Sequence, residues 1–138
     1  MCSGDRLDGD MAEEEFAFID AFVVKERRQR LRCLVASPRR RKQFLRELAH
    51  FKWLDQRRVR TLAPSAQNPQ AVAKLLRQKG APDSCFVVSE DSRIDSKQMP
   101  LLAALEQVIG YGMGTLISCI PGKLAYFEDE DQRCLLEI

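Results

Sequence analysis

Histidine, tryptophan and closely spaced cysteines are scarce in this sequence. Its 138 residues include one histidine, one tryptophan and five cysteines, and no two cysteines have C-x-x-C spacing. Zinc sites usually draw on close ligand pairs, so the pattern predicts no metal and no other cofactor. The cysteines are Cys2, Cys33, Cys85, Cys119 and Cys134. Cys85 and Cys119 stand inside apolar runs and are predicted to be buried, reduced thiols, as is usual in cytoplasmic proteins.

Long hydrophobic runs are also missing. None approaches the roughly 18 residues that a membrane span needs, and the acidic N-terminus lacks the apolar segment of a secretory signal. With 45% apolar and 30% charged residues the composition is that of a globular protein. We therefore expect a cytoplasmic protein without membrane contact, with a flexible tail over residues 1–12 and a single domain over 13–138.

The small net charge of +2 hides a strong asymmetry. Residues 1–24 carry a net charge of −6, residues 25–60 of +11 and residues 61–138 of −3. The central segment is thus strongly basic, and nine of its 14 cations crowd two adjacent helical stretches that we call the basic block. They are Arg27, Arg28, Arg30, Arg32, Arg39, Arg40, Arg41, Lys42 and Arg46.

Two interpretations of the basic block are open. Clustered guanidinium groups suit phosphates and carboxylates, which predicts an anionic partner, either nucleic acid or an acidic protein surface. Alternatively the block is a solvated helix face, neutralised by the protein's own acids near Glu13 to Glu15. No helix-turn-helix, RNP motif or zinc finger accompanies the block. The oligomeric state is not predicted.

Apolar spacing and capping residues define the expected elements. Helices are predicted from Glu13 through Val23, with an extension or a second helix after a bend near Val24; from Ser37-Pro38 through residue 51; from Asn68-Pro69 to Gly80; and over 100–109. Residues 54–66 read as irregular and residues 90–98 as a polar loop. Strands are predicted at 84–89 and 114–120, joined by a Pro121-Gly122 turn to 123–128, with an optional edge strand at 133–138.

The implied fold class is α+β. In the order α-α-α-β-α-β-β-(β), a helical first half packs on a small, mostly antiparallel sheet of three to four strands. We further expect residues 84–89, 114–120 and 123–128 to share one sheet, with the last two as an antiparallel hairpin.

Residues 82–97 also contain a nuclease-like spacing. Pro82-Asp83 followed by Asp95-Ser96-Lys97 resembles the PD-(D/E)-x-K nuclease motif. The resemblance implies that Asp83 and Asp95 hold Mg²⁺ and that Lys97 stabilises charge at the scissile phosphate. The sequence departs from that pattern because its D-x-K does not lie in an apolar strand. We expect the two carboxylates to be too far apart to share a cation, with a turn and a polar loop as the other interpretation.

Three smaller features have both a chemical and a structural interpretation. Glu90, Asp91 and Asp95 follow a strand and are candidate metal ligands or an acidic turn. The glycine-rich segment 110–114 leaves a helix C-terminus, which favours a helix stop over a phosphate loop. His50 is a candidate base for a cysteine nucleophile or a simple helix-end residue.

The best functional hypothesis is a small, non-enzymatic binding or regulatory protein whose basic helical face engages nucleic acid or an acidic protein. The alternative is a metal-dependent nuclease, or another hydrolase, using the acidic loop after the first strand. The sequence leaves open whether the protein is an enzyme.

Overall fold

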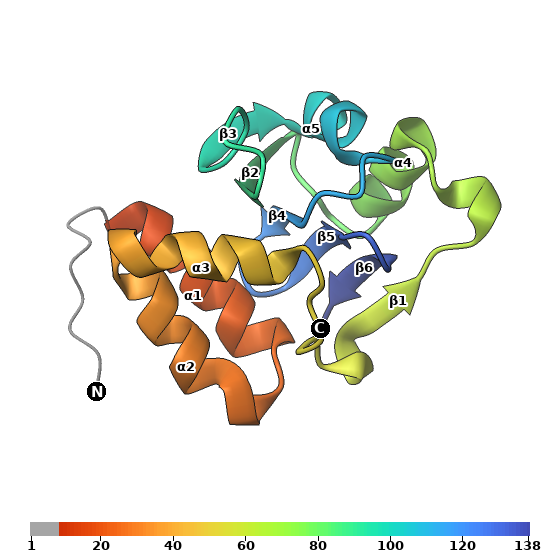
Figure 1. Ribbon diagram of the computed structural model, residues 1–138. Helices are drawn as coiled ribbons and strands as arrows, with labels where there is room; N and C mark the ends of the chain where they lie inside the picture. The colour runs from red at the N-terminus through yellow and green to blue at the C-terminus, as the bar shows by residue number, and fades with distance from the viewer. Residues whose placement is uncertain (1–8) are drawn as a thin grey trace.

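A six-stranded sheet lies between two groups of helices (Figure 1). The computed structural model describes residues 9–138, and their side chains from Glu13 onward. The tail expected at residues 1–12 therefore lies largely outside the described residues. The first group of helices is α1 (Gly9–Phe22), α2 (Lys25–Ala36) and α3 (Pro38–Leu48), and the second is α4 (Pro69–Gln78) and α5 (Leu101–Val108).

Every neighbouring pair of strands in the sheet is antiparallel, in the order β1-β6-β5-β4-β2-β3. The strands are β1 (Val59–Thr61), β2 (Ser84–Ser89), β3 (Lys97–Pro100), β4 (Thr115–Ile120), β5 (Leu124–Glu128) and β6 (Arg133–Glu137). The α+β class and the β4–β5 hairpin are confirmed. The expected count of three to four strands was too low.

The missing strands are the two edges of the sheet. β1 lies in the segment expected to be irregular, and β3 begins in the one expected to be a polar loop. Both are short and largely exposed, so no alternation of apolar residues marks them. β6 is a strand as foreseen, but it lies between β1 and β5 and is not an edge.

Helices cover both faces of the sheet (Figure 1). Successive side chains of a strand point to opposite faces. In β5, Phe127 packs into the cluster beneath α1–α3, and Tyr126 packs into the cluster beneath α4 and α5. Because both faces are buried, the inner strands β2, β4, β5 and β6 read as largely apolar runs. Each fully buried large side chain contributes about 1.5–3 kcal/mol of transfer free energy.

The helix boundaries follow the expected capping. Ser37 Oγ accepts the Arg40 N–H, with Pro38 at the first helical position. Asn68 Oδ1 accepts the Ala71 N–H at 2.9 Å in the same arrangement. The bend near Val24 is real, so α1 and α2 are separate helices. In the described part of the chain, no helix has the length and apolar character that crossing a bilayer requires.

The β4–β5 turn is as tight as its residues indicate. The Lys123 N–H donates to the Ile120 carbonyl at 2.9 Å, and Gly122 has a φ of 71°. A positive φ at the second central position is the signature of a type II turn, which glycine adopts without strain. The expected Pro-Gly turn is confirmed.

Candidate functional site

Within the basic block, the arginines of α2 are mostly engaged. Arg30 makes a bidentate contact with Glu47 of α3 at 2.9 and 2.6 Å. One terminal nitrogen of the Arg32 guanidinium donates to both carboxylate oxygens of Asp20 in α1, at 2.9 and 2.7 Å. Exposed pairs of this kind contribute about 0–1 kcal/mol each, but they fix where the guanidinium groups point.

Two further α2 arginines make contacts near the junction between α1 and α2. The Arg27 guanidinium lies 4.1 Å from the ring centroid of Trp53, a cation–π contact. Arg28 Nε donates to the Val23 carbonyl at 2.9 Å. These side chains hold α2 against the end of α1 and the segment before β1, so they are only partly available to a ligand.

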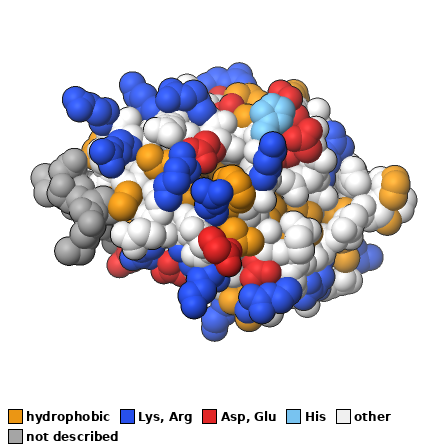
Figure 2. Space-filling model, turned by 60° about the horizontal axis from the view of Figure 1, so that its bottom comes forward, with side chains coloured by type: hydrophobic (Ala, Val, Ile, Leu, Met, Phe, Trp, Pro, Cys, Tyr) orange, Lys and Arg blue, Asp and Glu red, His pale blue; other side chains and the backbone are white. Residues whose placement is uncertain are grey.

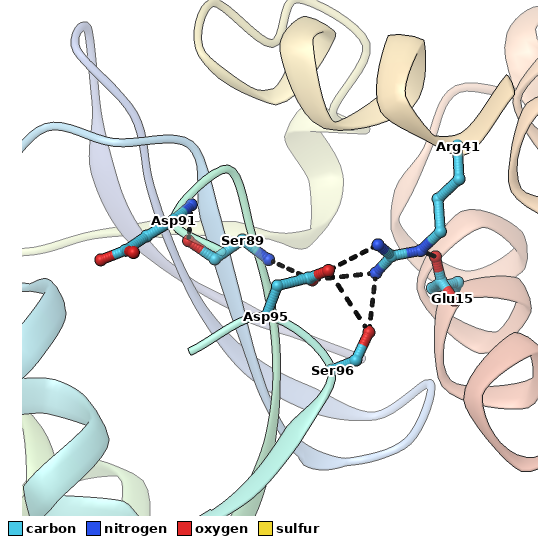
Figure 3. Close-up of polar contacts among 6 residues, drawn as sticks. All are labelled: Glu15, Arg41, Ser89, Asp91, Asp95 and Ser96. Carbon is cyan, nitrogen blue, oxygen red and sulfur yellow. Dashed lines mark hydrogen bonds and ion pairs between the residues drawn. The ribbon is translucent and has the colours of Figure 1, made fainter. Parts of the chain in front are cut away.

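Arg41 is the centre of a partly buried ion-pair cluster (Figure 3). Its two terminal nitrogens donate to the Asp95 carboxylate, and its Nε donates to Glu15 at 2.7 Å. Ser96 Oγ accepts from the same guanidinium at 3.1 Å. The Glu15 side chain is 0% exposed, and those of Arg41 and Asp95 are 12% and 13% exposed. The cluster ties α1, α3 and the β2–β3 loop together.

The electrostatics of this cluster keep Arg41 charged. Burial alone would lower the Arg41 pKa, but hydrogen bonds and charges from Asp95 and Glu15 outweigh it and raise the pKa above its ordinary value. The expected neutralisation by the N-terminal acids is thus real for Arg41, which pairs with Glu15, and also for Arg32, which pairs with Asp20. Arg41 is a structural residue and presents no cation to a partner.

Four cations of the block remain exposed and, among the described residues, make no ion pair or side-chain hydrogen bond. They are Arg39, Arg40, Lys42 and Arg46, and we call them the α3 stripe. At helical spacing Arg39, Lys42 and Arg46 lie on one side of α3, and Arg40 is exposed on a flank of the helix, about 100° round from Arg39. Phe44 and Leu48 are buried on the opposite side. Figure 2 shows basic side chains spread over one face of the molecule, with acidic and apolar side chains between them.

The residues of the nuclease-like spacing are not brought together. The Asp83 side chain is 97% exposed and lies 3.7 Å from Arg77. Its carbonyl accepts the Leu101 N–H at one end of β2, whereas Asp95 accepts the Ser89 N–H at the other end. The length of β2 is about 17 Å at the usual rise per residue. Lys97, at the start of β3, is exposed.

The three candidate metal ligands already accept hydrogen bonds from other groups of the protein. Glu90 accepts the Gly114 N–H, Asp91 accepts both the backbone N–H and the guanidinium of Arg93, and Asp95 holds Arg41. Within the described residues, no group of three or more His, Cys, Asp or Glu side chains is placed to hold a metal ion. These carboxylates therefore serve as acceptors for backbone N–H groups and arginines of the protein itself.

The glycine-rich segment is likewise satisfied internally. The N–H groups of Gly110 and Gly112 donate to the fully buried Glu128 carboxylate, at 3.1 and 2.8 Å to the nearer oxygen. The Tyr126 hydroxyl donates to the same group at 2.7 Å. Gly110 and Gly112 have φ of 95° and 71°. The segment is a helix stop whose donors face the protein, and they are not turned toward an external phosphate.

His50 contacts carboxylates. Its Nδ1 lies 3.0 Å from Asp131 and its Nε2 lies 3.3 Å from Glu130, both in the β5–β6 loop. The hydrogen bond with Asp131 raises the His50 pKa, and the neighbouring acids add to the effect. His50 therefore joins the end of α3 to the β5–β6 loop at the surface, and we call this pair of contacts the His50 clasp.

The predicted burial of the cysteines is confirmed. Cys85 and Cys119 are buried free thiols, and burial raises the pKa of each to about 12. A thiol with so high a pKa is almost wholly protonated at neutral pH and is a poor nucleophile. Cys134 is a third buried free thiol of the same kind.

A feature that sequence reasoning missed is a cavity of about 310 Å³. It opens between the β2–β3 loop, the end of α5 and the α5–β4 loop. Its lining includes Asp91, Ile94, Glu106, Tyr111, Met113 and Thr115. Two large apolar side chains stand exposed at it, Tyr111 at 69% and Met113 at 38%. The sequence offered one signal for this cavity. Tyr111 and Met113 are large apolar side chains that alternate with glycines, and such a segment is not expected to lie in a core.

The β2–β3 loop borders both the cavity and a hollow at the α3 stripe. Glu90 lines a shallow hollow together with Lys42 and Arg46, and the next residue, Asp91, lines the cavity. The same loop is fastened to α3 by the Arg41–Asp95 contact. Comparisons with known proteins give no further guide: no family model, curated protein or solved structure matches this chain.

Proposed function

We propose that this protein is a binding protein whose α3 stripe contacts the phosphates of a nucleic acid. The observation that carries the proposal is the exposure of Arg39, Arg40, Lys42 and Arg46 together, without acidic partners among the described residues. Most other arginines of the block already have intramolecular contacts. Phosphates neutralised by such side chains release counterions, which drives binding.

The position of the stripe on its helix adds support. Arg39 and Arg40 lie in the first turn of α3, and that turn contains no acidic residue. Cations there oppose the helix dipole and cost about 0.3–1 kcal/mol each at low salt. An anion bound at this turn would offset that cost. Arginine also offers a planar donor fork that fits phosphate oxygens in pairs.

The test is the binding of a labelled single-stranded RNA oligomer, followed by fluorescence anisotropy at 50 mM salt. The test variant is Arg39→Gln/Lys42→Gln/Arg46→Gln. The matched control, Lys74→Gln/Lys97→Gln/Lys123→Gln, removes the same charge from exposed sites outside α3. We expect the stripe variant to bind roughly tenfold more weakly or worse, and the control to stay close to wild type.

Other outcomes would contradict the proposal. Equal losses in both variants would mean that only net charge matters. Absence of RNA binding at low salt, together with stripe-dependent binding of polyglutamate, would replace nucleic acid by an acidic protein as the partner.

A further inference from the structure

We propose that the cavity beside the α3 stripe receives one nucleobase of a single-stranded nucleic acid. This inference rests on the proposed function, because it needs phosphates lying on α3. The β2–β3 loop connects the two regions: Glu90 lines a hollow together with Lys42 and Arg46, and the next residue, Asp91, lines the cavity. A strand whose backbone follows the stripe would have bases within reach of the other side of this loop.

The mouth of the cavity provides a stacking surface. Tyr111 and Met113 are exposed there, and few other large apolar side chains of the described chain are. Bases stack on exposed aromatic rings regardless of sequence, and this is the usual platform for single strands. Gly110 and Gly112, both with positive φ, flank Tyr111 and turn it away from the core.

One residue that lines the cavity, Thr115, carries a hydroxyl group. Thr115 Oγ1 and Ser89 Oγ lie 2.7 Å apart, and Ser89 Oγ also accepts the Asp91 N–H at 2.9 Å. The two hydroxyls have two hydrogens and only one is used between them. When Ser89 donates to Thr115, the Thr115 hydroxyl hydrogen is left for a group in the cavity.

The charge of the lining selects the kind of base. Arg93 neutralises Asp91, with a 2.9 Å contact. Glu106 and Gln107 also line the cavity, and neither has a side-chain partner among the described residues. An unneutralised carboxylate accepts from base donors. Guanine offers it an N1–H and an N2 amino group side by side, whereas the single N–H of uracil lies between two carbonyls that a carboxylate repels. The cavity should therefore prefer guanine to uracil.

Two 12-nucleotide RNAs test this inference, r(U)₁₂ and r(UUG)₄. Their phosphates are equal in number, so any difference in affinity comes from the bases. We expect wild type to bind r(UUG)₄ more tightly, Glu106→Gln to abolish the preference, and the exposed-site control Glu13→Gln to retain it. Tyr111→Ala should weaken r(UUG)₄ binding by about 5–150-fold, the range for one stacked base. Tyr111→Phe should retain the affinity.

The outcomes separate this inference from the proposed function. Equal affinity for both RNAs, with binding still dependent on the α3 stripe, would overturn the base pocket and leave phosphate binding intact. A guanine preference that survives Glu106→Gln and Tyr111→Ala would also overturn the pocket. If the wild type does not bind RNA even at low salt, both the base pocket and the proposed function are overturned. Circular dichroism shows whether each variant is folded, and Tyr111 is exposed enough for its replacement to be tolerated.

Discussion

At the scale of single residues, arginines adjacent in sequence play opposite roles. Arg41 and Lys42 follow one another on α3, yet one is inside an ion-pair cluster and the other faces solvent. The reason is the helical period, which turns successive side chains by about 100°. Position 41 faces α1 and the β2–β3 loop, where Arg41 pairs with Glu15 and Asp95. Position 42 faces outward. Composition alone assigns both residues to one basic block.

The first prediction concerns Arg41. Arg41→Ala removes the Arg41 cation from the buried Glu15 and the partly buried Asp95, so the free energy of unfolding should fall by about 3–5 kcal/mol. Arg40→Ala, on the exposed side of the same turn, should change it by less than about 0.5 kcal/mol. Urea denaturation followed by circular dichroism measures both. Similar losses for the two variants would show that the cluster does not stabilise the fold.

A second prediction at this scale concerns Gly114. A Cβ at this position would overlap the backbone carbonyl of Leu48, at the end of α3. Gly114→Ala must therefore push α3 from the α5–β4 loop, and we expect a loss of about 1–3 kcal/mol or more. Gly110 has open space around it, so Gly110→Ala should cost only about 1–2 kcal/mol for its left-handed backbone. Thermal unfolding of the two variants gives the order, and a less stable Gly110→Ala would contradict it.

At the scale of elements, loops are fastened to helices by charged contacts. His50, just after α3, clasps Glu130 and Asp131 of the β5–β6 loop. Asp129 of the same loop accepts the Phe51 N–H at 2.9 Å. The loop thus has one contact whose strength depends on histidine protonation and one that does not.

The third prediction is the pH dependence of that clasp. The His50 pKa is raised in the folded state, so its contribution to stability is complete below the unfolded value near 6.5. It is lost as pH rises through the folded value. His50→Gln should therefore reduce the unfolding free energy more at pH 5.5 than at pH 9. An equal reduction at the two pH values would rule out the charged clasp.

Elements were predictable from sequence where side chains are buried. Ser37-Pro38 and Asn68-Pro69 mark helix starts, and the apolar runs in β2, β4, β5 and β6 mark strands. β1 and β3 were not predictable, because backbone pairing at the sheet edges defines them and their side chains are polar or exposed. The basic block was visible, but the pairing that removes Arg30, Arg32 and Arg41 from it depends on tertiary contacts. For the cavity, Tyr111 and Met113 beside the glycines were the only sequence signal, because the three separate segments that form it meet only in the fold.

At the scale of the whole molecule, the two hydrophobic clusters make the sheet the centre of one folding unit. Cys85 and Cys119 lie in the cluster under α4 and α5. The fourth prediction is that both thiols react only when the protein unfolds. Site-resolved alkylation, read by mass spectrometry, should be slow at both in the native state and should accelerate with urea. Rapid native alkylation of Cys119 would contradict the burial and support a reactive thiol.

Charge is also arranged at the level of the whole molecule. The net charge is only +2, yet Arg39, Lys42 and Arg46, which are unpaired among the described residues, share one side of α3, while acids such as Glu128 and Asp95 are turned inward onto protein donors. A ligand with many phosphates senses the local surface more than the total charge, because salt screens charges beyond about 10 Å. The α3 stripe is therefore the part of the molecule that should dominate its interaction with a polyanion.

The most direct test of this account is the salt dependence of RNA binding. The logarithm of the binding constant falls linearly with the logarithm of salt concentration, with a slope of about −0.7 per phosphate contacted on a single strand. Replacing Arg39, Lys42 and Arg46 by glutamine should flatten that slope by about 2 units, and the Lys74, Lys97 and Lys123 control should leave it unchanged. An identical slope for the stripe variant and the wild type would show that α3 does not contact phosphates, contradicting the central claim.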